Sequence, residues 1–333
     1  MPASTADAPC PEQAFNATAL KWHTCAWLLL PVLIFLAGWM HWYAALPLML
    51  LTAAGLAPRK RKEPQTRDSL PAFPLFTRSS FLALAAFAAL MTLSGWGEWV
   101  NQHPDHIVRN ACLRELVASP WPVIFPDGNM LVYNTGFWLV PALAGKLAGL
   151  DAARVFVVLW GTWGLFLTWL WLCVFSGRRS LLLALLMAAF GSLLNFQCWL
   201  GLDLFRLHYF GTAEQIMCSA NASIPVLLFF IFLASGRMPL PWIPLLFAAT
   251  AFYSPLAALG GLPLAACQWY RQWRGVPPLR DVLLHPSFSA SVLLGVCFLL
   301  YYGTVNAPSS HMGMRPFYTH PGDFPLMATS FLL

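Results

Sequence analysis

The chain has 333 residues, of which 59% are hydrophobic and 10% are charged, and its mean hydropathy is +0.63. A soluble domain carries about 25% charged residues, so this composition excludes an ordinary soluble domain and indicates a polytopic α-helical membrane protein. The formal net charge of +6 is partly concentrated in one run, Arg59 to Lys62, and does not indicate nucleic-acid binding.

The N-terminal third predicts a short cytoplasmic segment followed by the first membrane spans. Residues 1–24 are polar, and residues 25–333 are predicted to form a single transmembrane helical domain. The first apolar run, 25–56, is interrupted by the aromatic stretch 38–42, which indicates two short spans joined by an interfacial turn. A single long, tilted helix is the alternative. The basic loop 58–79 is placed in the cytoplasm by the positive-inside rule, so residues 81–96 cross outward.

The stretch near 97–130 is therefore predicted to lie on the outer face. Pro104 suits the first turn of a helix, and apolar residues recur from Val108 to Val117 at spacings of three to five. This pattern predicts an amphipathic helix that ends before Pro120 and lies along the membrane surface, because it is too short and too charged to span.

The rest of the chain alternates apolar runs with two further polar outer loops, near 199–223 and 304–323. The predicted spans are 152–175, 181–194, 224–234, 288–302 and a pair over 240–270 that is broken near Ser254–Pro255. Whether residues 131–149 span is ambiguous. If they do not span, six arginines from Arg178 onward fall inside, whereas a full span leaves four basic residues inside. By six against four, the positive-inside rule favours a segment that does not span. The total is roughly seven to ten transmembrane helices. The final apolar run, 324–333, is half a span, which suggests a truncated chain.

Candidate chemistry gathers at the start of the surface helix, in the sequence His103-Pro104-Asp105-His106. The Asp105 carboxylate is suited to take a proton from an acceptor hydroxyl, or to bind a divalent cation beside a phosphate. Arg109 lies four residues further on and is suited to pair with a phosphate. The plainer interpretation is that Asp105 is an N-terminal helix residue bridged to Arg109. His103 and His106 are candidate metal ligands with Asp105, and surface solvation is the alternative for both.

The second polar interval adds Arg206 and His208, which reach the same site if that interval closes over it; an ordinary solvated loop is the alternative. Cys198 and Cys218 flank this interval, and a disulfide between them is an option in an oxidising compartment. The sequence contains no P-loop, no Gly-x-Ser-x-Gly and no His-Glu-x-x-His motif, and it has no chain of charges within its spans. Chemistry or binding in the loops is therefore favoured over transport through the bundle.

Two consecutive segments carry a family resemblance. The outer segment WVNQHPDHIVRNACLRELVASPWPVIFPDG is followed by LVYNTGFWLVPALAGKLAGLDAARV. This layout, over roughly residues 80–200, resembles the GT-C superfamily of integral membrane glycosyltransferases and, more narrowly, uncharacterised bacterial membrane proteins with the same layout. In that superfamily the first large outer loop carries an acidic catalytic residue, and Asp105 stands at this position. Tyr133, Pro141, Lys146 and Gly149 stand in the segment that follows.

The resemblance implies a multi-pass protein of the bacterial inner membrane. Such a protein moves a sugar from a polyprenyl-phosphate carrier to an acceptor on the outer face. Asp105 would be the base or the ligand of a divalent cation, with Arg109, His106, His103, Arg206, His208 and Tyr133 around the substrate. Two departures are that Asp105 has no adjacent acidic partner and that the chain ends early. The resemblance also implies that residues 131–149 span, against the charge count.

Two alternatives to a glycosyltransferase stay open at this point. One is a transporter or flippase subunit for a lipid-linked glycan, which the short, proline-broken spans favour because such spans line cavities. The other is a non-catalytic membrane assembly partner. The sequence does not identify the donor sugar or the acceptor.

Overall fold

The computed structural model describes residues 14–15, 17–57, 73–74, 77–100, 102–126, 128–190, 211–273 and 278–303. Over these residues the chain is an all-α bundle, apart from a two-residue antiparallel pairing of β1 (Ala14–Phe15) with β2 (Phe73–Pro74). Four of its helices are long and apolar enough to cross a membrane: α1 (Ala17–Trp39), α6 (Leu150–Ser176), α9 (Thr212–Ala234) and α13 (Pro286–Gly303). The predicted class, a helical membrane protein, is thus confirmed, while the number of passes stays a prediction.

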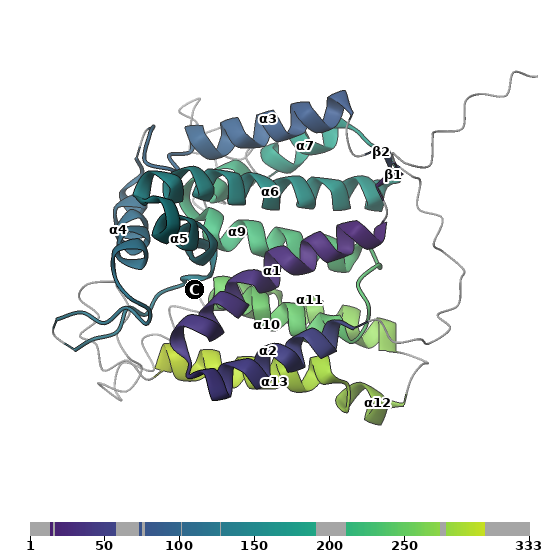
Figure 1. The fold of residues 1–333 in the computed structure, drawn as a ribbon. Coiled ribbons are helices and arrows are strands. Elements are labelled where there is room, and N and C mark those ends of the chain that lie inside the picture. Colours follow the sequence, from purple (N-terminus) through teal and green to yellow (C-terminus); the bar gives the residue numbers. More distant parts are fainter. Residues whose placement is uncertain are drawn as a thin grey trace, which may run out of the picture.

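The remaining helices are shorter or less apolar. They are α2 (Trp42–Leu56), α3 (Arg78–Leu93), α4 (Pro104–Ala118), α5 (Gly136–Ala148), α7 (Leu181–Ala189), α10 (Trp242–Tyr253), α11 (Pro255–Trp273) and α12 (Leu279–Leu283). In Figure 1 most helices run side by side, and α4 lies crosswise at one end of the bundle, beside α5.

Two predicted helix breaks lie where the sequence placed them. Helices α1 and α2 are separated at Met40 and His41, so residues 25–56 form two helices, as predicted, and not a single long one. Helices α10 and α11 are separated at Ser254, in an extended conformation directly before Pro255, because a residue that precedes proline is disfavoured in the helical region.

Two other predictions differ from the structure. Helix α5 has 13 residues, so it is about 20 Å long and falls short of a hydrocarbon core of about 30 Å. The helical part of residues 131–149 is therefore shorter than the full span that the family resemblance implies, and whether this segment spans stays a prediction. The expected loop near 199–223 is helical from Thr212 onward. Helix α9 begins at that residue and continues through the predicted short span 224–234.

The interior of the bundle is held by aromatic side chains that also satisfy backbone groups. Trp27 of α1 stacks on Trp160 of α6, with ring centroids 5.0 Å apart, and its indole N–H donates to the Trp160 carbonyl over 3.0 Å. Tyr253 of α10 stacks on the other side at 5.4 Å and donates to the Trp27 carbonyl over 2.7 Å. These contacts join three helices and pair the Trp27 indole and the Tyr253 hydroxyl with backbone carbonyls, whereas the indole N–H of Trp160 is buried without a hydrogen-bond partner.

Glycines let other helices approach closely, as expected where apolar burial alone does not drive association in lipid. A Cβ at Gly164 of α6 would lie 2.6 Å from Ile224 of α9 and 2.7 Å from Trp27. Gly55 of α2 abuts the backbone of Ser287 of α13, whose hydroxyl donates to the Gly55 carbonyl over 2.6 Å. The packing is therefore specified by small residues at the crossings.

Helices α3 and α6 run antiparallel, which fixes where the candidate site lies. At one end, Arg179, just after α6, donates to the hydroxyl of Ser80 in the first turn of α3. At the other end, Glu98, just after α3, pairs with Arg154 in the first turn of α6. Helix α4 lies at this second end (Figure 1), opposite the Arg178–Arg179 pair.

Candidate functional site

Helix α4 begins and ends as its sequence predicts. Pro104 occupies the first turn, and His103 is the N-cap, with its Nδ1 accepting the backbone N–H of Asp105 over 3.3 Å. The helix stops at Ala118, before Pro120. Cys112, Leu113 and Leu116 face the bundle, so the predicted amphipathic helix is confirmed.

Two polar residues on α4 are buried, and for one of them, His106, surface solvation was the alternative to metal binding. His106 has 1% of its surface exposed and Arg109 has 8%. Asp105 stays half exposed, at 53% of its side chain, and its Oδ2 lies 3.5 Å from Nη2 of Arg109. The predicted pairing of Asp105 with Arg109 on one helix face is therefore confirmed, and the exposed, solvated interpretation of His106 is wrong. His106 is buried because α9 packs against it.

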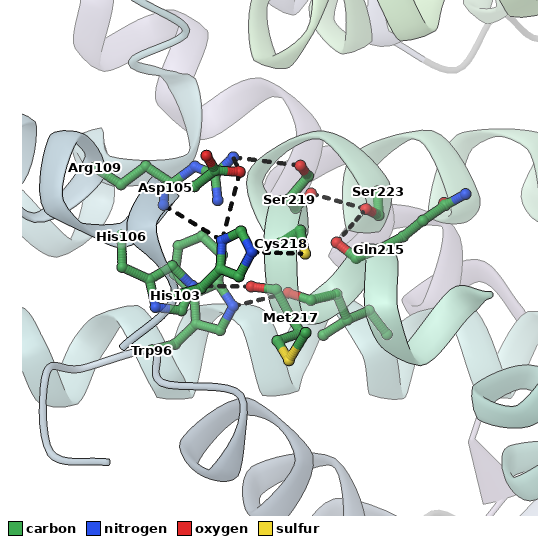
Figure 2. Close-up of polar contacts among 11 residues, drawn as sticks. Trp96, His103, Asp105, His106, Arg109, Gln215, Met217, Cys218, Ser219 and Ser223 are labelled. Carbon is green, nitrogen blue, oxygen red and sulfur yellow. Dashed lines mark hydrogen bonds and ion pairs between the residues drawn. The ribbon is translucent and has the colours of Figure 1, made fainter. Parts of the chain in front are cut away.

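The part of α9 that faces α4 is broken at Ser219. Ser219 has φ −152° and ψ 43°, which are not helical values, so carbonyls of the preceding turn lose their usual partners. Three side chains bond three consecutive carbonyls there. Ser223 donates to Gln215 over 3.0 Å, the indole of Trp96 to Ile216 over 2.8 Å, and His106 lies 2.9 Å from Met217. Figure 2 shows these contacts converging on the break.

His106 acts in this arrangement as a neutral donor. Burial lowers the pKa of His106, the Met217 carbonyl opposes this, and the nearby positive charge of Arg109 adds to the lowering. A neutral ring that binds a carbonyl through Nε2 carries its proton on that atom. Its Nδ1 is buried without a hydrogen-bond partner, and the ring lies 5.1 Å from that of Trp96.

Arg109 brings a buried positive charge to the same break. Its Nη2 donates to the hydroxyl of Ser219 over 3.3 Å, and its guanidinium lies 5.9 Å from the centre of the Trp96 ring. Its Nε and Nη1 are buried and have no hydrogen-bond partner. Arg109 is paired through Nη2 with Asp105 and Ser219, and the two further donors indicate capacity for an anion.

Tyr133 lies within electrostatic reach of this guanidinium. Burial raises the pKa of Tyr133, and the positive charge of Arg109 opposes that change. The Tyr133 backbone is held by Tyr301 of α13, whose hydroxyl lies 3.3 Å from its nitrogen and 3.2 Å from its carbonyl oxygen. Tyr133 and Arg109 therefore lie close together in the fold, while a role of Tyr133 in substrate binding stays a prediction. Arg206 and His208 lie outside the described residues.

A second polar cluster, around Glu98, anchors the loop before α4. The Oε2 atom of Glu98 accepts from Arg114 of α4 and from Arg154 of α6, each over 2.5 Å, and Arg154 also pairs with Asp151 over 2.7 Å. Burial raises the pKa of Glu98, but the hydrogen bonds from the two arginines outweigh it and hold that pKa below its usual range. Glu98 is thus an ion-paired anchor between α4 and α6.

Sequence reasoning assigned no role to several of these residues. Glu98 and Arg114 stood in the polar stretch without a partner, while Trp96 and Ser219 carried no signal at all. The contacts that give them roles join positions 56, 110 and 120 residues apart. No local spacing in one sequence could have revealed those pairs.

The site also contains a thiol, that of Cys218, which lies near the ring of His103. His103 Nε2 lies 3.9 Å from Sγ of Cys218, one residue before the break, and the Cys218 thiol is free. Cys198, the partner considered for a disulfide with Cys218, lies outside the described residues. Among the described residues, no group of three or more histidine, cysteine, aspartate and glutamate side chains is arranged to hold a metal ion.

Comparison with family models, curated proteins and solved structures gave no match to this chain. Its function is therefore argued from the geometry of α4, α9 and the loop before α4.

Proposed function

We propose that the protein transfers a sugar from a polyprenyl-phosphate carrier to an acceptor hydroxyl, as the GT-C resemblance implies. The observation that supports this most directly is one pairing on α4. Asp105 is a half-exposed carboxylate, and Arg109, one turn further on, is a buried cation with two unpaired N–H groups. A base and an anion site then lie side by side, which displacement of a phosphate from a sugar requires.

The residues take the following roles in this proposal. The Asp105 carboxylate accepts the proton of the acceptor hydroxyl as its oxygen attacks C1 of the sugar. The bond from C1 to the phosphate oxygen breaks, and polyprenyl phosphate leaves. Arg109, with its free Nε and Nη1, stabilises the charge that develops on that phosphate.

The position of α4 fits a lipid-linked donor. The helix follows the apolar α3 and lies across one end of the bundle (Figure 1). Its outward residues include the exposed apolar side chains of Ile107 and Val108. A surface helix with such residues lies in the headgroup region, where the phosphate of a membrane-anchored carrier is found.

The test is turnover by purified protein in nanodiscs that contain radiolabelled polyprenyl-phosphate hexoses, with a membrane extract as the source of acceptors. Released polyprenyl phosphate and carrier binding are measured separately. Asp105→Asn keeps the side-chain volume and removes the base, so we expect turnover to fall by at least about 100-fold with binding retained. Asp151→Asn, at a 92% exposed side chain, is the matched control. Unchanged turnover in Asp105→Asn would refute the role of Asp105.

A carrier of lipid-linked glycans is the second candidate, and the break in α9 favours it. Discontinuous membrane helices place backbone groups and half-helix ends at the substrate sites of many transporters. A carrier would move the polyprenyl-phosphate sugar between leaflets without releasing polyprenyl phosphate. It would tolerate Asp105→Asn and lose activity with Arg109→Met.

A further inference from the structure

Three side chains at the junction of α4 and α9 are arranged as a nucleophile, a base and a group that orients the base, as in nucleophilic catalysis. Sγ of Cys218 lies 3.9 Å from Nε2 of His103, and Nδ1 of the same ring lies 3.7 Å from Oδ2 of Asp105. Figure 2 shows the ring of His103 between the thiol and the carboxylate. We infer that Cys218, His103 and Asp105 form a thiol-based acyl-transfer site whose donor is the acyl ester of an anionic membrane phospholipid.

Each member of the series has the chemistry that its position requires. A thiol is made nucleophilic by an adjacent base, and the base is oriented by a third group. The two nitrogens of His103 face the two partners separately, so one can accept the thiol proton while the other donates to Asp105. These distances are longer than working hydrogen bonds, as is common for catalytic contacts before a substrate is bound.

The tautomer of His103 changes between the resting and the working state. At rest, Nδ1 accepts the backbone N–H of Asp105 over 3.3 Å, which places the ring proton on Nε2. A proton on Nδ1 would instead be donated to the Asp105 carboxylate 3.7 Å away, and Nε2 would then accept from the thiol. The partly exposed ring can exchange its proton with water, and the change gives up the N-cap bond from the Asp105 backbone N–H.

The thiol is accessible, and a neighbouring cation, Arg109, can stabilise negative charge beside it. Cys218 is a free, partly exposed thiol directly before Ser219, where α9 is broken. Arg109 donates to the Ser219 hydroxyl over 3.3 Å and keeps two buried N–H groups without an acceptor. A guanidinium beside the nucleophile can stabilise the oxyanion that forms when a carbonyl is attacked, or bind a phosphate next to it.

The substrate class follows from the place of the site. The thiol belongs to α9, one of the four helices that can cross a membrane, and its partners belong to the surface helix α4. The ester carbonyls of phospholipids lie at this level, just below the headgroups. The buried positive charge of Arg109 favours a lipid whose headgroup is anionic.

The reaction balances without an oxidant or a reductant. The Cys218 sulfur attacks the ester carbonyl carbon while its proton moves to His103. The ester C–O bond then breaks, His103 returns the proton to the departing lipid oxygen, and an acyl thioester remains on Cys218. In the second half, His103 takes a proton from a hydroxyl, an amine or water that attacks the thioester, and the thiol is restored.

This inference goes beyond the proposed sugar transfer and gives Asp105 a different role. In sugar transfer Asp105 takes a proton from the acceptor, whereas in acyl transfer it positions His103. The two are separable, because Cys218→Ala removes the acyl-transfer nucleophile but leaves Asp105 and Arg109, the two groups with a role in the sugar-transfer step, in place. A failed acylation therefore leaves the glycosyltransferase proposal standing, and the reverse also holds.

The experiment uses the full chain in nanodiscs and the probe 4-nitrophenyl octanoate. Octanoyl groups that hydroxylamine removes are mapped by mass spectrometry, and their rate of formation at Cys218 is compared with that at Cys267. Cys267 is an exposed thiol on α11 and serves as the internal reference. We expect Cys218 to be acylated on the order of 100-fold faster than Cys267, the usual scale of base catalysis.

The variants assign the roles. His103→Asn removes the base but keeps a residue that caps helices well, so α4 should still form, and the rate at Cys218 should fall to that of Cys267. Asp105→Asn should lower the rate by a smaller factor, and His41→Asn, at an exposed histidine in the turn between α1 and α2, should leave it unchanged. Equal rates at the two cysteines, or an unchanged rate in His103→Asn, would overturn the proposed nucleophile and base.

The donor is tested in nanodiscs of phosphatidylglycerol with no added ester. We expect lysophosphatidylglycerol to be released and the fatty-acyl chain of that lipid to appear on Cys218. Both signals should be absent from Cys218→Ala. Acylation by the nitrophenyl ester without release of the lysolipid would overturn the phospholipid as the donor.

Discussion

His106 of α4 and the backbone carbonyl of Met217 of α9 are 111 residues apart in sequence and are joined by one hydrogen bond of 2.9 Å. The bond satisfies a carbonyl next to a break in a helix that can cross the membrane. Together with the indole of Trp96 on the neighbouring carbonyl of Ile216, it ties the surface helix and its preceding loop to α9. The candidate site thus depends on a contact in which a buried histidine must remain neutral.

The first prediction is a loss of stability in acid that depends on His106. Burial lowers the pKa of His106 in the folded protein, whereas the unfolded chain binds that proton near pH 6.5. Stability from this group is therefore complete above about pH 6.5 and is lost as the pH falls toward the folded pKa, by up to about 1.4 kcal/mol per pH unit. Unfolding midpoints in detergent between pH 7.5 and 5.5 measure this loss. His106→Gln should flatten the dependence of the unfolding midpoint on pH, and His41→Gln should not. Equal profiles for wild type and His106→Gln would contradict this prediction.

The second prediction concerns the Glu98 anchor. Glu98→Gln removes the charge that accepts from both Arg114 and Arg154, and it leaves the partly buried Arg154 with a weaker partner. We expect the free energy of unfolding to fall by about 1–3 kcal/mol, the range for a disrupted hydrogen bond to a charged group. Asp151→Asn is the control, because its exposed ion pair with Arg154 is worth about 0.2–1 kcal/mol. Equal effects of the two changes would show that Glu98 is not the anchor.

The third prediction separates binding from stability at Arg109. Arg109→Met keeps an extended apolar stem and removes a buried cation with two unpaired N–H groups. Replacing a poorly compensated buried charge by an apolar side chain is often neutral or stabilising, so the thermal midpoint should stay equal or rise. Binding of radiolabelled polyprenyl phosphate should weaken at least about 10-fold, since a charged hydrogen bond is worth about 1.5–3 kcal/mol.

Arg178→Met, at an exposed position near the opposite end of the bundle, is the matched control for that variant. It should change neither the midpoint nor the binding. A large drop in the midpoint of Arg109→Met with unchanged binding would assign Arg109 to the fold alone.

The fourth prediction concerns the crossing of α6 with α9. Gly164→Ala places a Cβ 2.6 Å from Ile224 and 2.7 Å from Trp27, so the helices must move apart. Overpacking of this kind costs about 1–3 kcal/mol, which thermal unfolding in detergent would show. Gly295→Ala on α13 meets no atom within 4 Å and should be neutral or stabilising by up to about 1 kcal/mol. A neutral Gly164→Ala would mean that the crossing is looser than described.

Some parts of the site could be read from local sequence because local chemistry determines them. Pro104 and Pro120 bracket α4, since proline fits the first turn of a helix and cannot continue one. Asp105 and Arg109 lie on one face because residues four apart do so on any helix. These features need no information from the rest of the chain.

The break in α9 could not be read in this way. Polar and apolar residues alternate irregularly around Ser219, and this pattern predicts a loop and not an interrupted helix. The interrupted helix is tolerated because Trp96, His106 and Ser223 supply donors to the exposed carbonyls. Two of these donors come from other segments, so the local sequence holds no sign of them.

The sequence by itself determined a helical membrane protein, the bounds of its surface helix and the pairing of Asp105 with Arg109, because composition and spacing act locally. Only the tertiary structure decided that His106 and Arg109 are buried against α9 and that Glu98 joins α4 to α6. It also placed Cys218 beside His103. These outcomes depend on which donor meets which acceptor across more than 50 residues, and that choice is made by helix packing.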